Sequence, residues 1–126
     1  MRPTDAGSGV PDRWAAYAEA MRRGDYFRAH EWLEDSWRKT RDPREQVLIW
    51  IAAAFVHWQR GRPTGVERLL EKVEGRLRAA GDAAALLRVV GRWRQAAHEH
   101  RPCPGVSDRV IRLALTWAGH RTERMG

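Results

Sequence analysis

The stretch "VLIWIAAAFVHWQR", residues 47–60, would be apolar on almost every side of a helix. A helix that is hydrophobic all round is buried, either at the centre of a protein or in a membrane. The stretch is shorter than the ~20 apolar residues that a bilayer span requires. We therefore predict a central helix with neighbours on most sides, and an all-α fold around it.

Start and stop signals bracket this central helix. Asp42, Pro43 and Glu45 supply an N-cap, a first-turn proline and the glutamate of a capping box, and Gly61 ends the helix. Two helices are predicted before it. They span residues 11–23, ended by a glycine, and residues 25–39, which begin at an aspartate N-cap.

The chain after Gly61 predicts up to three more helices. Thr64 and Glu67 have the spacing of a capping box for a helix that ends near Gly81. Apolar residues at helical spacing follow over 86–97, and Ser107 is placed to cap a last helix. The sequence thus predicts a compact bundle or array of five to six short helices, with antiparallel neighbours favoured by the short loops.

Length and composition predict one domain. The 126 residues are enough for a single hydrophobic core. Residues 1–9 are rich in Gly, Ser, Thr and Pro, and we expect a disordered tail there and one helical domain over 10–126. No signal peptide or membrane span is recognisable, and the single Cys103 excludes an intrachain disulfide, so we expect a cytoplasmic protein without a membrane partner.

The net charge of +7 raises the question of an anionic partner. The basic residues are almost all arginines, and they are dispersed along the chain instead of forming a run. This distribution favours solvated helix faces over a nucleic-acid surface, which stays an alternative.

The second predicted helix contains the candidate site, "GDYFRAHEWLEDSW", residues 24–37. His30 and Glu34 are one helical turn apart, and we expect both on the buried stripe between Tyr26 and Trp37, with Glu31 on the flank. A buried carboxylate requires a hydrogen-bond partner. The candidates for Glu34 are His30, Arg60 and a tryptophan N–H.

Three interpretations of this site remain open. His30, Glu34 and His57 could form a satisfied polar network, line a pocket for a protein or a small molecule, or bind a divalent metal in a hydrolase-like enzyme. We expect no cofactor. Elsewhere, His98-Glu99-His100 is a weaker metal candidate at a helix end, and the prolines that flank Cys103 predict a rigid connector.

The same residues carry a family resemblance. Gly24, a Tyr-Phe pair, and His-Glu-x-x-Glu-x-x-Trp over 30–37 are followed by "LIWIAAAFVHWQRGR" and "GVERLLEKVEGRL". Over residues 14–80 this pattern resembles the domain of unknown function numbered 309. The resemblance implies an all-α fold found in bacterial and archaeal proteins, and it implies no activity.

We therefore expect a non-catalytic binding domain that uses the face formed by His30, Glu34 and Trp37. Its partner would be a protein, a small molecule or a second copy of the chain. The alternative is a metal-dependent enzyme with His30, Glu34 and His57 as ligands.

Overall fold

The computed structural model describes residues 12–119, and it is all-helical over that range. The predicted tail, residues 1–9, lies outside the described residues, as do both ends of the predicted domain. The helices of the described part are α2 (Arg13–Arg23), α3 (Tyr26–Thr40), α4 (Pro43–Gln59), α5 (Pro63–Ala80), α6 (Ala84–His98) and α7 (Asp108–Trp117). The predicted fold class is confirmed.

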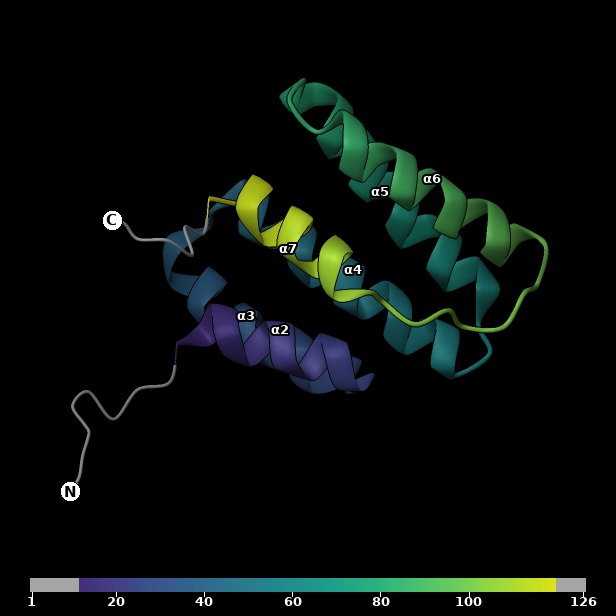
Figure 1. The fold of residues 1–126 in the computed structure, drawn as a ribbon, viewed down its shortest axis with the longest axis horizontal. Helices are drawn as coiled ribbons and strands as arrows, with labels where there is room; N and C mark the ends of the chain where they lie inside the picture. The colour runs from purple at the N-terminus through teal and green to yellow at the C-terminus, as the bar shows by residue number, and fades with distance from the viewer. Residues whose placement is uncertain (1–11, 120–126) are drawn as a thin grey trace.

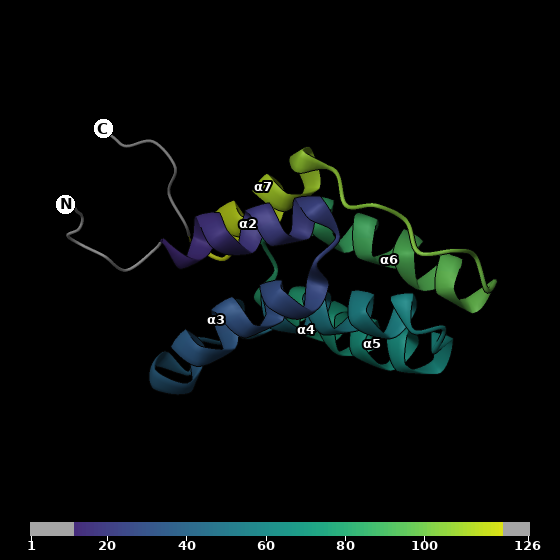
Figure 2. The ribbon, with the colours of Figure 1, turned by 90° about the horizontal axis from the view of Figure 1, so that it is seen from below.

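The helices form two layers of three. Figure 2 shows α3, α4 and α5 in one layer and α2, α7 and α6 in the other. Within each layer, neighbours pack side by side, and across the layers α2 packs on α3, α7 on α4, and α6 on α5. The last helix, α7, therefore fills the slot between α2 and α6 (Figure 1).

Helix α4 is the centre of the core, as its apolar sequence predicts. It contacts α3, α5 and α7. Its buried residues occur on all sides of the helix: Glu45, Val47, Leu48, Ile49, Ile51, Ala52, Ala54, Phe55 and Trp58. None of the helices within residues 12–119 is long and hydrophobic enough to cross a membrane.

Several helix ends match the caps predicted from the sequence, but the two predicted capping boxes do not form. The side chains of Asp42 and Ser107 accept hydrogen bonds from the first turns of α4 and α7. Gly24 ends α2 in the left-handed conformation, with φ of 79°. The predicted capping box at Thr64 is wrong, because α5 already begins at Pro63. The glutamate of the other predicted box, Glu45, bonds to residues outside its own helix.

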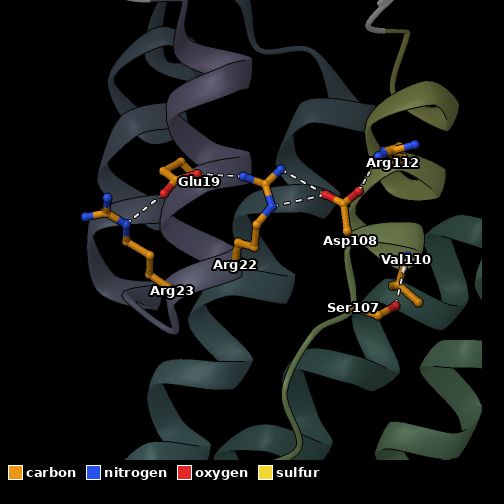
Figure 3. A network of polar contacts seen from close by, with 7 residues as sticks. All are labelled: Glu19, Arg22, Arg23, Ser107, Asp108, Val110 and Arg112. Atoms are coloured by element: carbon orange, nitrogen blue, oxygen red, sulfur yellow. Dashed lines mark hydrogen bonds and ion pairs between the residues drawn. The ribbon is translucent and has the colours of Figure 1, made fainter.

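A polar network joins α7 to α2 on the surface (Figure 3). Arg22 donates from Nη2 to Asp108 Oδ1 at 2.9 Å and from Nη1 to Glu19 Oε1 at 2.6 Å. Asp108 also pairs with Arg112 on its own helix. These contacts fix the start of α7 against the end of α2.

Cationic side chains cover most of the tryptophans that are only partly buried. Arg13 lies over Trp14, Arg41 over Trp37, and Arg76 and Lys72 over Trp50, with the cation 4.6 to 5.6 Å from the ring centre. Such cation–π contacts use the positive charge of the chain within the fold. Part of the net charge therefore stabilises aromatic packing.

Candidate functional site

Helix α3 lies at one edge of its layer and packs against α2 and α4. Its buried residues are Tyr26, Ala29 and Leu33. Successive residues advance by about 100° around a helix. His30 therefore lies at the border of the buried stripe, and Glu34 lies beyond it.

The expectation that Glu34 is buried is wrong. Its side chain is 36% exposed, and that of His30 is 23% exposed. The buried stripe is centred on Leu33, so the neighbouring Glu34 is turned toward solvent. Glu34 Oε1 lies 3.7 Å from His30 Nδ1 and 3.6 Å from Arg38 Nη2, which are ion-pair distances beyond hydrogen-bond range.

The predicted hydrogen-bonded network does not form. Within residues 12–119, the buried side-chain nitrogens without a hydrogen-bond partner are His30 Nδ1, Trp37 Nε1 and His57 Nδ1. All three belong to the candidate residues. Each orphaned buried group costs about 1–3 kcal/mol relative to a satisfied one.

Neither Arg60 nor His57 pairs with Glu34 in the described part of the chain. Arg60 is exposed at the C-terminal end of α4, and its side chain has no partner among the described residues. The His57 ring lies against α5, where a Cβ on Gly65 would be 2.8 Å from its Nδ1. No three His, Cys, Asp or Glu side chains in the described part of the chain are grouped so as to hold a metal ion. The proposed ligand set of His30, Glu34 and His57 is therefore not assembled.

Tyr26 belongs to the core instead of the site. It is 4% exposed, and its ring centre lies 4.9 Å from that of Phe55. Burial raises the pKa of the Tyr26 hydroxyl, with a smaller contribution from the charge of Cys103. We expect Tyr26 to remain neutral and to serve in packing.

The solvent side of α3 carries the features that sequence reasoning missed. Phe27 is 54% exposed and stacks on His30, with ring centres 6.4 Å apart and planes inclined by 11°. An open hollow of about 410 Å³ follows the same helix, lined by Arg28, Glu31, Trp32, Glu34, Asp35 and Arg38. The alternation of aromatic and charged residues in the sequence was the available signal for this surface.

The comparisons with known proteins concern this part of the chain. The family model of DUF309, a domain of unknown function, matches residues 14–69. The resemblance predicted from the motif over residues 14–80 is thereby confirmed for residues 14–69. No curated protein and no solved structure matches the chain significantly.

The DUF309 match covers most of α2, all of α3 and α4, and the first turns of α5. It therefore includes the whole α3 surface and the central helix that supports it. Helices α6 and α7, which complete the second layer, lie outside the matched residues.

Proposed function

We propose that this protein is a non-catalytic interaction domain that binds a partner protein through the α3 face. We define this face as Phe27, His30, Glu31, Glu34 and Trp37 together with the adjoining hollow. The observation that carries the proposal is the exposure of Phe27. No other large hydrophobic side chain of residues 12–119 is comparably exposed. Exposed aromatic residues are typical anchors of protein interfaces.

Trp32 supports the same location. It is partly buried and lines the hollow on α3. Unlike Trp14, Trp37 and Trp50, it has no cation stacked on its ring, and its N–H has no partner among residues 12–119. A partner side chain could supply both contacts.

The charges of the α3 face indicate a basic partner segment. Arg28 pairs with Asp25 and Arg38 pairs with Glu34, so the cations on this side of α3 have local partners. Glu31 and Asp35, in contrast, have no ion-pair partner in the described part of the chain. A partner with basic side chains beside an apolar one would match Phe27 and the free carboxylates.

A metal-dependent hydrolase remains the alternative function. It would require His30, Glu34 and His57 to converge on one ion. The contact between His57 and Gly65 of α5 favours the interaction domain over this alternative.

A site-specific cross-linking experiment tests the interaction. A photoreactive phenylalanine analogue replaces Phe27 in the living host, and the same analogue replaces exposed Arg88 on α6 as a control. The protein that cross-links through position 27 is identified, purified, and titrated with the wild type and with Phe27→Ser. We expect at least tenfold weaker binding to Phe27→Ser, because loss of an aromatic anchor costs about 1.4 kcal/mol or more.

Three outcomes would overturn the proposal. Equal cross-linking from positions 27 and 88 would show that the face is not selective. Undiminished binding of the purified partner to Phe27→Ser would show that Phe27 is not an anchor. Cross-linking of the chain to itself would assign the face to a homo-oligomer instead of a basic partner.

A further inference from the structure

A second cavity lies at the opposite end of α4 from its N-cap, where the α4–α5 loop meets the end of α6. It measures about 270 Å³ and is lined by Trp58, Gly61, Arg62, Pro63, Ala97, His100, Arg101, Pro102 and Cys103. The cavity is therefore large enough for a small polar ligand.

The backbone around this cavity is rigidly held. Trp58 Nε1 donates to the carbonyl of Arg101 at 2.9 Å, which fixes the segment after α6 over the indole. His100 has a positive φ of 58°, and this conformation turns the chain at the end of α6. The cavity is thus formed by the fold and not by a single loop.

The charges that line the cavity have one sign. Arg62 and Arg101 are cationic and exposed, and no carboxylate is among the lining residues. Burial raises the pKa of the Cys103 thiol, so that this group is neutral at pH 7. Arg101 pairs with Glu99 at 2.7 Å, whereas the Arg62 side chain has no partner within residues 12–119.

Backbone carbonyl groups around the cavity already accept hydrogen bonds from within the fold. The carbonyls of His57 and Trp58 at the end of α4 accept from the N–H groups of Arg62 and Gly61. Those of Ala96 and Ala97 at the end of α6 likewise accept from Arg101 and His100. The nearby acceptors are therefore already satisfied, while the cationic donor of Arg62 is not.

We propose that the cavity lined by Arg62, His100 and Arg101 binds the phosphate group of a small molecule. Guanidinium groups suit phosphate because their planar array of N–H donors can bond two oxygens at once. The negative charge of a phosphate would also compensate Arg62, which has no partner among residues 12–119, whereas Arg101 already pairs with Glu99. The start of α5 at Pro63 adds a partial positive charge at the same place.

The proposal is tested by titrating inorganic phosphate into the isotopically labelled protein at constant ionic strength, with chloride as the exchanged anion. The indole N–H signal of Trp58 reports binding, because this group lies in the cavity wall. We expect a saturable shift in the wild type and about tenfold weaker binding in Arg62→Gln, as for the loss of one charge-assisted hydrogen bond. Arg88→Gln removes the same charge from exposed α6 and should bind as the wild type does.

A parallel titration with a short oligonucleotide that lacks terminal phosphates distinguishes the source of the phosphate. Such a strand carries only phosphodiesters, so weak binding by comparison with inorganic phosphate supports a small-molecule ligand. Saturable binding of the oligonucleotide without saturable binding of phosphate would overturn the proposal in favour of nucleic acid. A linear response to phosphate that does not saturate would also overturn the proposal. So would an equal loss of phosphate affinity in Arg62→Gln and Arg88→Gln, because it would show that only the net charge of the protein matters.

Discussion

Gly65 and His57 set how closely α5 can approach α4. A Cβ at position 65 would lie 2.8 Å from His57 Nδ1 and 2.9 Å from its Cγ, well inside normal contact. The imidazole ring is attached near this point and cannot swing aside as the end of a long chain could. Gly65 is therefore required by packing, although its backbone is helical.

We predict that Gly65→Ala lowers the free energy of unfolding by about 1 kcal/mol, because the steric cost exceeds the gain in helix propensity. Gly75→Ala on the same helix meets no atom within 4 Å and should instead raise stability, by up to about 1 kcal/mol. Urea titrations of both variants measure the contrast. In a His57→Ala background the cost of Gly65→Ala should disappear, and its persistence there would contradict the proposed contact.

Glu74 is a second residue for which burial and pairing determine how much a substitution changes stability. The residue is 4% exposed, and its carboxylate accepts a hydrogen bond from Arg94 Nε at 3.0 Å, which joins α5 to α6. Glu74→Ala should lower stability by about 1 kcal/mol, because it removes the ion pairs with Arg94 and Arg78, whose partly exposed guanidinium groups can be solvated instead. Glu71→Ala, an exposed position on the same helix, should change stability much less. Similar losses for the two variants in thermal melts would show that the pair contributes little.

The sequence could not identify which glutamates are buried. Glu34, Glu45 and Glu74 all lie within amphipathic or apolar patterns, and only the last two are buried. Their burial depends on Arg13, Thr40 and Arg94, which come from other helices or loops and share no local pattern with them. Helical spacing predicts which residues share a face only to within about one position. Glu34 is one position from the buried Leu33, and this is enough to place it at the surface.

At the scale of the helices, the strongest patterns gave correct predictions. The uniformly apolar α4 is central, and Gly24, Gly61 and Gly81 lie at the ends of α2, α4 and α5. The N-terminal ends of the helices are harder to predict, because several nearby polar residues are each suitable as the N-cap. Asp25 and Ser107 are both good N-caps by residue type, yet Ser107 accepts a hydrogen bond from its helix and Asp25 does not.

This difference between the two caps can be measured. Ser107→Ala removes the bond from Val110 N to Ser107 Oγ, 3.2 Å long, and should cost about 1 kcal/mol of stability. Asp25→Ala removes only an exposed ion pair with Arg28 at 3.7 Å and should cost a few tenths of that. Chemical denaturation of both variants provides the comparison. A larger loss for Asp25→Ala would show that the cap geometry of α3 differs in solution.

At the scale of the whole molecule, α7 is held at both ends by carboxylates from different parts of the chain. Asp108 pairs with Arg22 of α2 at its start. At its end, Asp82 from the α5–α6 loop accepts from Trp117 Nε1 and Arg44 Nη2, each at 2.8 Å. The Arg44 guanidinium also lies 4.6 Å from the centre of the Trp117 ring. Polar contacts at both ends, in addition to apolar packing, therefore hold α7 in the second layer.

These contacts predict acid sensitivity. Hydrogen bonds from Arg44, and then from Trp117, lower the pKa of Asp82 below its ordinary 3.8. A lowered folded-state pKa gives stability that is fully present above pH 3.8 and is lost as the pH falls through the folded value. Asp82→Asn should thus be less stable than the wild type at pH 6, and the difference should narrow toward pH 2. A difference that is independent of pH in urea titrations would contradict the assignment.

The position of α7 between α2 and α6 also has a consequence for synthesis on the ribosome. Most contacts in this fold join helices that follow one another, and such local contacts form quickly. The contact between α2 and α7 is different, because it joins the first and last of the described helices. We expect the nascent chain to collapse early around α4 while the slot for α7 stays open. Until Ile111, Leu115 and Trp117 have left the exit tunnel, the apolar walls of that slot are accessible to chaperones or to neighbouring nascent chains.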